Sequence, residues 1–303
     1  MRIVLVGQGL FGKEVLETLI KNREDIVGVF CPKDKRGEAM KAFSESSNIA
    51  LFQPNHMKDP EVLHSYRSLS PDLAILAFVI DIFPESLLDI PSLGTICYHP
   101  SLLPKHRGAS GINWAVIQGD ERTGVTILWP DKGIDTGPIL LQKEVDIGPD
   151  DTTGSLYFNS LFPLGIDAIT ESVDLIRGGK APKIPQDNDL ATYEPPCDDK
   201  VASIDWTKPA REVYNMVRGC DPQPGAYSTL EGRMVRFYKA ELFLLEEKRH
   251  PGEIVAINER DVTVALNGGV LRIGKLKGDE GGKMDADEFA GRSGLKAGMR
   301  FGT

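Results

Sequence analysis

The stretch Gly94-Thr95-Ile96-Cys97-Tyr98-His99-Pro100-Ser101-Leu102-Leu103-Pro104, followed by Lys105-His106-Arg107-Gly108, organises the rest of the chain. It begins as an apolar, β-branched segment that predicts a strand, and it ends in prolines that exclude regular structure. His99 stands where the predicted strand gives way to the loop. Ligands of open α/β sheets bind beyond the carboxyl ends of the strands. His99 is therefore a candidate catalytic residue, and a purely structural, buried role is the alternative.

Strand-like and helix-like segments alternate on both sides of this stretch. The expected strands are 2–6, 26–30, 50–52, 73–78, 123–129 and 139–145, and the expected helices are 13–22, 37–47, 60–69, 84–88, 111–119 and 156–177. This alternation predicts an α/β fold, a Rossmann-like, doubly wound and mostly parallel sheet.

The composition changes near Gly178. Residues 178–200 hold several prolines and charges and few large apolar groups, which is typical of a linker. A short helix is expected at 209–218, and short strands follow at 234–238, 252–257, 262–266 and 270–273. We therefore expect two domains. Residues 1–200 form a catalytic domain with the linker at its end, and residues 201–303 form a small antiparallel, OB-like β-barrel.

The totals exclude several classes of protein. The chain has 303 residues, of which 41% are hydrophobic and 26% charged, as in a globular protein with an ordinary core. Its net charge of −9 argues against a nucleic-acid partner, and no apolar run approaches the roughly 20 residues needed to span a membrane. The four cysteines lack CxxC spacing, which favours reduced thiols in a cytoplasmic protein and no metal site.

A glycine motif, Gly7-Gln8-Gly9-Leu10-Phe11-Gly12, lies between the first strand and the first helix and matches the dinucleotide fingerprint. That fingerprint also needs an acid at the end of the second strand. Here Val29-Phe30-Cys31-Pro32 leads instead into Lys33-Asp34-Lys35-Arg36. We expect a tight turn that only needs small residues. An NAD(P) site whose basic residues hold a 2′-phosphate is the alternative.

Asp135 lies 36 residues after His99, in the loop Lys132-Gly133-Ile134-Asp135-Thr136-Gly137-Pro138 between two predicted strands. Taken alone, Asp135 is best explained as a turn residue. However, two strand-end loops of one sheet can converge on one crevice. A histidine oriented by a carboxylate suits acid–base chemistry near pH 7.

At these residues the chain resembles a known family. The run His99–Pro104 followed by Asp135-Thr136-Gly137 is similar to the signature of the formyltransferases that use 10-formyltetrahydrofolate. That family includes enzymes acting on methionyl-tRNA or amino sugars, and the amino-terminal hydrolase domain of 10-formyltetrahydrofolate dehydrogenase. Residues 218–226 resemble the motif that opens the family's carboxy-terminal barrel, so the similarity covers nearly the whole chain.

One position departs from the transferases of this family. They carry an asparagine two residues before the histidine, whereas this chain has Cys97, a weak hydrogen-bond donor. The hydrolase domain also lacks that asparagine, and residues 105–110 and 112–114 look like that branch. The resemblance is therefore greatest to the hydrolase domain. We expect no carrier or aldehyde dehydrogenase domain in a chain of 303 residues.

The resemblance implies an enzyme of one-carbon metabolism that removes the formyl group of 10-formyltetrahydrofolate by hydrolysis or transfer. His99 would donate to the formyl oxygen or protonate the leaving nitrogen. Asp135 would hold His99 and take a proton from the nucleophile, with Cys97 and Ser101 in support. The implied folate contacts are Phe78, Asp81, Ile82, Phe83, Asp131, Gly133 and Ile134.

Several alternatives stay open at this point. The acceptor is water or a specific amine, such as that of methionyl-tRNA or an amino sugar. The alternative to an enzyme is a module that binds a nucleotide through Gly7–Gly12 and has no catalytic activity. Arg107 either meets the folate tail or an acceptor phosphate, or it forms a surface ion pair, which we favour.

Overall fold

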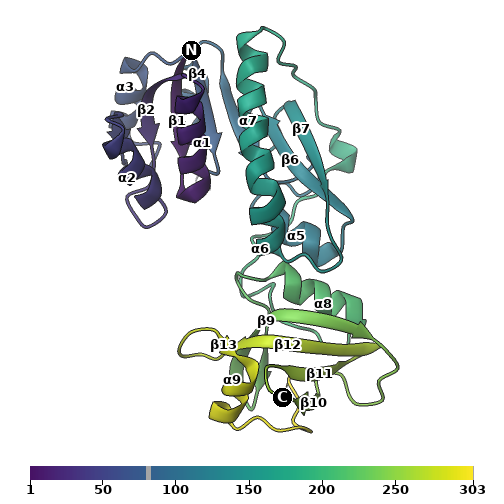
Figure 1. The fold of residues 1–303 in the computed structure, drawn as a ribbon. Helices are drawn as coiled ribbons and strands as arrows, with labels where there is room; N and C mark the ends of the chain where they lie inside the picture. Colours follow the sequence, from purple (N-terminus) through teal and green to yellow (C-terminus); the bar gives the residue numbers. More distant parts are fainter. Residues whose placement is uncertain (80–82, 303) are drawn as a thin grey trace. The chain divides into compact units, whose positions relative to one another are not determined.

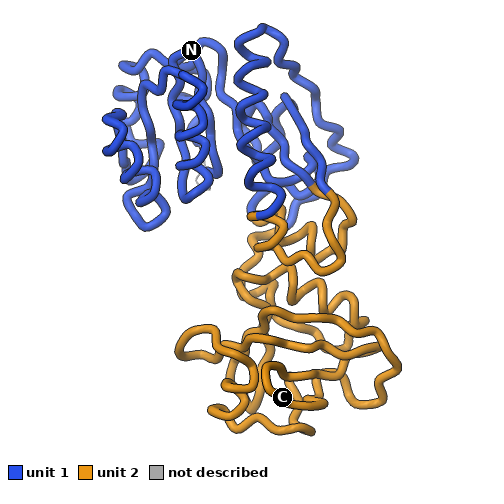
Figure 2. Tube along the Cα trace, viewed as in Figure 1, with its two compact units in different colours: residues 1–109, 124–145, 159–194 blue, residues 110–123, 146–158, 195–303 orange. Residues whose placement is uncertain are grey.

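The computed structural model describes residues 1–79 and 83–302 and divides into two compact units, shown in Figure 2. Unit 1 holds residues 1–109, 124–145 and 159–194, and unit 2 holds residues 110–123, 146–158 and 195–303. Unit 2 thus includes three segments, 110–123, 146–158 and 195–200, from the first predicted domain. The division into domains at residue 200 stays a prediction.

A seven-stranded sheet, drawn in Figure 1, forms the frame of unit 1. Its strand order is β3-β2-β1-β4-β5-β6-β7. The strands are β1 (Arg2–Gly7), β2 (Asp25–Phe30), β3 (Leu51–Phe52), β4 (Leu73–Ala77), β5 (Thr95–His99), β6 (Arg122–Leu128) and β7 (Ile139–Asp146). Strands β1 to β5 pair in parallel, and β5 pairs with β6 antiparallel. The prediction of a doubly wound, mostly parallel sheet is confirmed.

Helices cover both faces of this sheet. The helices of unit 1 are α1 (Gly9–Lys21), α2 (Glu38–Ser46), α3 (Pro60–Ser68), α4 (Glu85–Leu88) and α7 (Phe162–Arg177). Val4 and Val6 of β1 pack with Tyr66 of α3 in one buried cluster. Helices α1 and α7 lie side by side (Figure 1). Gly165 lets α7 approach the sheet, because a Cβ there would meet the Tyr98 ring at 2.5 Å.

The glycine motif forms the expected tight turn between β1 and α1. The helix begins at Gly9, four residues before the predicted start, and the Gly12 N–H donates to the Gln8 carbonyl at 3.0 Å. A Cβ on Gly7 would lie 2.8 Å from the Ala77 carbonyl oxygen, and one on Gly12 would lie 2.6 Å from the Met40 sulfur. Close packing therefore explains the need for small residues at both positions.

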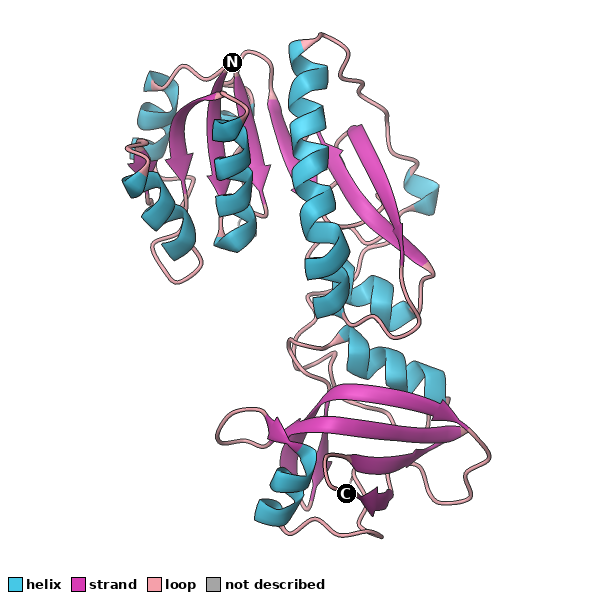
Figure 3. Ribbon diagram, viewed as in Figure 1, coloured by secondary structure: helices cyan, strands magenta, loops and turns pink. Residues whose placement is uncertain are grey.

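Unit 2 is built on an antiparallel half-barrel sheet of order β10-β11-β12-β9-β8, with β13 paired to β12. The strands, magenta in Figure 3, are β8 (Tyr227–Leu230), β9 (Arg233–Leu244), β10 (Ile254–Ile257), β11 (Val262–Leu266), β12 (Gly269–Lys277) and β13 (Met284–Asp285). The helices are α5 (Gly111–Gln118), α6 (Thr153–Leu156), α8 (Ala210–Gly219) and α9 (Ala286–Ser293). This confirms the predicted antiparallel architecture.

Some elements differ from the sequence-based expectation. Strand β9 continues to Leu244, well beyond the predicted end at residue 238, because antiparallel pairing with β12 holds its largely exposed second half. Strand β8 and helix α9 were not predicted. The long helix expected at 156–177 is interrupted by a π-helical turn at Tyr157–Leu161. Among the described residues, no helix is both long and apolar enough to cross a membrane.

Candidate active site

His99 is the last residue of β5, and it is 5% exposed. Its Nε2 lies 2.8 Å from the carbonyl oxygen of His106. Because a carbonyl can only accept, Nε2 carries the proton in this bond. The other ring nitrogen, Nδ1, is thereby left to exchange a proton with its surroundings.

Asp135 lies in the loop between β6 and β7 and has a left-handed backbone with φ of 54°. Its Oδ2 accepts a hydrogen bond from the Gly108 N–H at 2.8 Å and lies 3.5 Å from His99 Nδ1. The side chain of Asp135 is 18% exposed and that of His99 is 7% exposed. The two loops that the sequence analysis paired are thus brought together in the structure.

A hydrogen-bonded clamp holds the Asp135 loop. The Gln186 Nε2 donates to the carbonyl oxygens of Asp135 and Gly137, both at 2.7 Å. Its Oε1 accepts from the guanidinium of Arg107 at 3.1 and 2.8 Å, and Arg107 also donates to Asn188 Oδ1 at 2.8 Å. Arg107 is 9% exposed and binds side-chain amides, so the expected surface ion pair is wrong.

Gln186 was not among the predicted site residues. It lies in the segment 178–200, which its composition marked as a linker, and it contacts a residue 51 positions earlier. His106 behaves similarly, since its Nδ1 lies 3.3 Å from Glu194 Oε1 in the same segment. No pattern in the local sequence identifies such long-range contacts.

Cys97 lies on β5 two residues before His99, so both side chains point to the same face of the strand. It packs against Leu103, Leu128 and Ile139. Burial, together with the nearby charge of Asp135, raises the pKa of its thiol well above the usual range. Its Sγ lies 3.7 Å from the Tyr98 carbonyl oxygen, to which the thiol donates. Cys97 is therefore a neutral thiol engaged with its own backbone.

Ser101 is fully buried and shapes the loop that follows β5. Its Oγ donates to the Lys105 carbonyl at 2.7 Å, and its own carbonyl accepts from Thr126 Oγ1 at 2.6 Å. No contact of Ser101 with Asp135 is found among residues 1–79 and 83–302. Its position is that of a loop support.

Of the predicted folate residues after β4, Phe78 and Phe83 each pack against other aromatic rings. Phe78 has φ of 64°, and its ring centroid lies 6.2 Å from that of Phe11 and 6.3 Å from that of Tyr98. Phe83 packs edge-on against Tyr66 at 6.3 Å. Asp81 and Ile82 lie outside the described residues.

The remaining predicted folate residues lie next to Asp135. Asp131 Oδ1 accepts from the Gly133 N–H at 2.9 Å and from Thr136 Oγ1 at 2.6 Å, which closes the turn. Ile134 is 49% exposed, so an apolar side chain faces solvent beside the carboxylate. In the described part of the chain, no group of three or more metal-ligating side chains is found.

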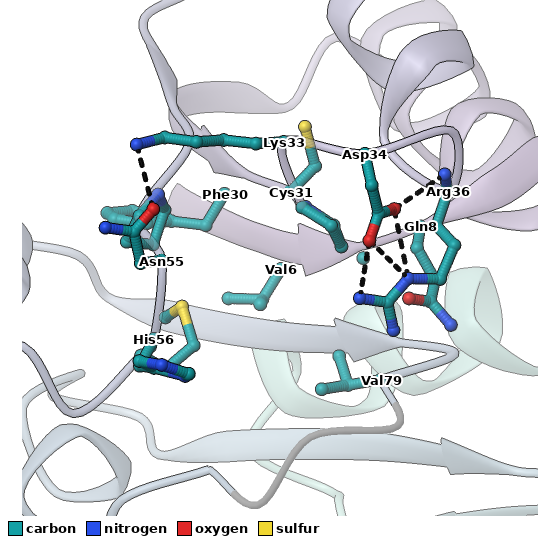
Figure 4. A pocket seen from close by; sticks show the side chains of 14 residues that line it. Val6, Gln8, Phe30, Cys31, Lys33, Asp34, Arg36, Asn55, His56 and Val79 are labelled. Atoms are coloured by element: carbon teal, nitrogen blue, oxygen red, sulfur yellow. Dashed lines mark hydrogen bonds and ion pairs between the residues drawn. The ribbon is translucent and has the colours of Figure 1, made fainter.

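A pocket of about 350 Å³ lies elsewhere on unit 1, beyond the ends of β1, β2 and β4. Figure 4 shows its side chains, among them Gln8, Lys33 and Arg36. Of the predicted site residues that the structure describes, none lines this pocket.

Comparison with known proteins connects this geometry to a family. The profile of the formyl transferase family matches residues 1–163, and that of the formyl transferase C-terminal domain matches residues 198–294. Human mitochondrial 10-formyltetrahydrofolate dehydrogenase is 41% identical over 280 residues, which cover 89% of this chain and 30% of the relative. The chain spans less than a third of the length of the dehydrogenases of this type that it matches.

Methionyl-tRNA formyltransferase of Geotalea daltonii is 36% identical over 310 residues, which cover 100% of this chain and 98% of the relative. Among solved structures, HypX from Aquifex aeolicus in complex with tetrahydrofolic acid has a TM-score of 0.73 at 19% identity, covering 96% of this chain and 47% of that one. At this identity the likeness shows the fold alone. Both domain profiles and the full-length match lead to one conclusion: the chain belongs to the formyl transferase family.

Proposed function

We propose that the protein removes the formyl group of 10-formyltetrahydrofolate, with water as the favoured acceptor, and releases tetrahydrofolate. The observation that carries this proposal is the pair of His99 Nδ1 and Asp135 Oδ2, 3.5 Å apart at the carboxyl end of β5, in a member of this family. Acid–base pairs of this kind contribute about 10²- to 10⁴-fold to a rate.

The orientation of the His99 ring supports separate roles for its two nitrogens. Since Nε2 donates to the His106 carbonyl, the neutral ring has its lone pair on Nδ1, toward Asp135. A water or amine that contacts both Nδ1 and the carboxylate from the side loses its proton to this pair as it attacks the formyl carbon. The protonated ring is then stabilised by Asp135, and the proton is available for the leaving N10.

The Asp135 carboxylate is positioned before any ligand arrives. The Gly108 N–H and the Gln186 clamp fix both its side chain and its backbone. Such preorganisation lowers the reorganisation needed in the transition state. In this proposal Asp135 and His99 are the catalytic residues, and Ser101 supports the loop between them.

Cys97 favours hydrolysis over transfer. A strong donor beside His99 would stabilise the oxyanion that forms on the formyl oxygen, and removing one such donor costs about 100-fold or more. The Cys97 thiol is a weak donor and is turned to the Tyr98 carbonyl. Water, present at high concentration, tolerates a poorly stabilised transition state better than a dilute amine does.

The folate would lie along the end of β4 and the β6–β7 loop. Phe78 and the exposed Ile134 would offer apolar surface to the pterin, and backbone contacts are proposed at Asp81, Ile82 and Phe83. Asp131 and Gly133 would hold the shape of the loop. No metal is proposed for this chemistry. We also propose a cytoplasmic location, because the cysteines of the described chain are free thiols.

The test is incubation of the protein with 10-formyltetrahydrofolate, with formate, tetrahydrofolate and any formylated product measured separately. Formate should account for most of the tetrahydrofolate released. His99→Ala should lower the rate by about 10²- to 10⁴-fold. His64→Ala, which changes an exposed histidine on α3, is the matched control and should leave the rate unchanged. A fully active His99→Ala protein would refute the proposal.

Transfer to a specific amine is the second candidate. It is favoured by the match to a methionyl-tRNA formyltransferase over 98% of that protein's length. The same assay distinguishes the two, since a formylated product in excess of formate, with methionyl-tRNA or an amino sugar added, would establish transfer.

A further inference from the structure

The pocket at the ends of β1, β2 and β4 is separate from the residues of the proposed reaction, and we call it the switch pocket. Its volume is about 350 Å³. It is lined by Val6, Gly7, Gln8, Phe30, Cys31, Pro32, Lys33, Asp34, Arg36, Pro54, Asn55, His56, Met57 and Val79, all of which belong to unit 1.

The pocket lies where the direction of the sheet reverses. Strand β1 pairs with β2 on one side and with β4 on the other, so the following connections run to opposite sides. A crevice opens at the carboxyl ends of the strands at such a point, and ligands of open α/β sheets bind there. The topology therefore supports a ligand site at this edge of the sheet.

Gln8 supplies an independent indication of a ligand site. It is only 6% exposed, and its side chain does not cap α1. Within residues 1–79 and 83–302 its amide has no hydrogen-bond partner, although it lines the pocket. Because Gln8 lines the pocket, both the oxygen and the nitrogen of its amide are available to a ligand.

Two cations, Lys33 and Arg36, and one carboxylate, Asp34, line the pocket, which leaves it with a positive formal charge. Lys33 Nζ donates to the neutral Asn55 Oδ1 at 3.1 Å, and among the described residues it has no carboxylate partner. Arg36 is held in place by Asp34 through bonds of 3.1 and 2.9 Å. Figure 4 shows the two cations at opposite ends of the pocket, with the Gln8 amide at the Arg36 end. The amino terminus of α1 adds partial positive charge at this end.

Between the charged ends the walls are apolar. Val6, Phe30, Met57 and Val79 line this part, and burial raises the pKa of Cys31 to about 11, so its thiol stays neutral. A ring with little charge fits such a surface. The volume suits a ligand of mononucleotide size, since small-molecule pockets begin at about 300 Å³.

A dinucleotide does not fit this arrangement. The Gly9 N–H, which would face a pyrophosphate at this turn, already donates to the Arg36 carbonyl at 2.6 Å. The loop 31–36 therefore closes over the Gly9 N–H of the glycine turn. The NAD(P) alternative from the sequence is not supported by this contact.

We propose that the switch pocket binds a nucleoside monophosphate, with its base against the apolar wall and its phosphate between Arg36 and the Gln8 amide. Lys33, Asn55 and His56 would contact the ribose or the edge of the base. This goes beyond the proposed formyl chemistry, which uses none of these residues.

The experiment is calorimetric titration of the whole protein with AMP, GMP, UMP and dTMP, with adenosine and inorganic phosphate as comparison ligands. The variants are Gln8→Leu, which removes the amide at similar size, and Lys33→Ala. Lys35→Ala is the matched control, because Lys35 is an exposed cation of the same loop that does not line the pocket. Thermal melting of each variant confirms that it is folded.

At least one monophosphate should bind with a Kd in the range of about 1–100 μM, and binding should weaken about tenfold in Gln8→Leu and in Lys33→Ala. Lys35→Ala should bind as the native protein does. The proposal is overturned if no monophosphate binds, if adenosine or inorganic phosphate binds as tightly, or if both pocket variants keep native affinity. Release of tetrahydrofolate is measured in parallel, so that failure here is distinguished from failure of the proposed function.

Discussion

Replacing Gln186 by alanine tests how the site is held together. The side chain donates to the carbonyl oxygens of Asp135 and Gly137 at 2.7 Å and accepts two bonds from Arg107. Asp135 has φ of 54°, a left-handed conformation that its surroundings must maintain. Without Gln186, the loop keeps the Gly108 contact at the carboxylate and loses the anchor on its backbone.

The magnitude follows from these contacts. Each neutral hydrogen bond contributes about 1 kcal/mol, and each buried group left without a partner costs about 1–3 kcal/mol. Gln186 is half-buried, so water replaces part of the loss. We expect the free energy of unfolding to fall by about 2–4 kcal/mol. A shift of Asp135 by about 1 Å would lower the turnover number by about 100-fold.

The assay combines urea unfolding with the release of tetrahydrofolate from 10-formyltetrahydrofolate. Asn188→Ala is the matched control, because it removes one bond to Arg107 and leaves the Asp135 loop anchored. Asn188→Ala should lower the free energy of unfolding by less than about 1 kcal/mol and should change the turnover number little. Gln186→Glu should be as inactive as Gln186→Ala, since a carboxylate cannot donate to the two carbonyls. Native stability and native turnover in Gln186→Ala would refute the clamp.

Three further predictions use the same protein. Cys97→Asn should raise the ratio of amine transfer to hydrolysis, measured from formylated product and formate, and an unchanged ratio would count against the role given to the missing donor. At pH 8, iodoacetamide followed by peptide mapping should find Cys197 alkylated before Cys31, because a hydrogen bond from Cys220 lowers the pKa of Cys197 while burial raises that of Cys31 to about 11. Earlier alkylation of Cys31 would contradict this order. Gly137→Ala should unfold at a clearly lower urea concentration than the native protein, since a Cβ at this position would overlap the backbone carbonyl oxygen of Trp129. Native stability of this variant would show that the loop shifts freely.

The sequence predicts the parts of this molecule that obey local rules. The apolar run at 73–78 and the β-branched stretch before His99 became β4 and β5, because alternating strands and helices leave few topologies. His99 and Asp135 lie together since both follow strands of one sheet, as expected. Close packing at Gly7 and Gly12 was likewise foreseeable from the turn.

Contacts across long stretches of sequence were not predictable in this way. Gln186 looked like a linker residue, because a glutamine among prolines and charges has no local signal for a contact 51 residues away. The position of the Gln8 amide in the pocket was likewise not predictable, since the motif that contains it indicates only a turn. The assignment of residues 110–123 and 146–158 to unit 2 depends on packing that the periodicity of the sequence does not indicate.

The catalytic pair can be tested with Asp135→Asn. Asparagine tolerates the left-handed backbone at φ of 54° and can still accept from the Gly108 N–H, so the fold and the loop should persist. Only the negative charge beside His99 Nδ1 is lost.

The decisive measurement is the single-turnover rate of tetrahydrofolate release by Asp135→Asn, with the Kd for tetrahydrofolate measured on the same sample. If His99 and Asp135 act as the acid–base pair, the single-turnover rate of Asp135→Asn should be lower by about 10²- to 10⁴-fold, and its Kd for tetrahydrofolate should be unchanged. A rate within about threefold of the native value, with native folate binding, would contradict His99–Asp135 catalysis, because general acid–base assistance is worth far more than that.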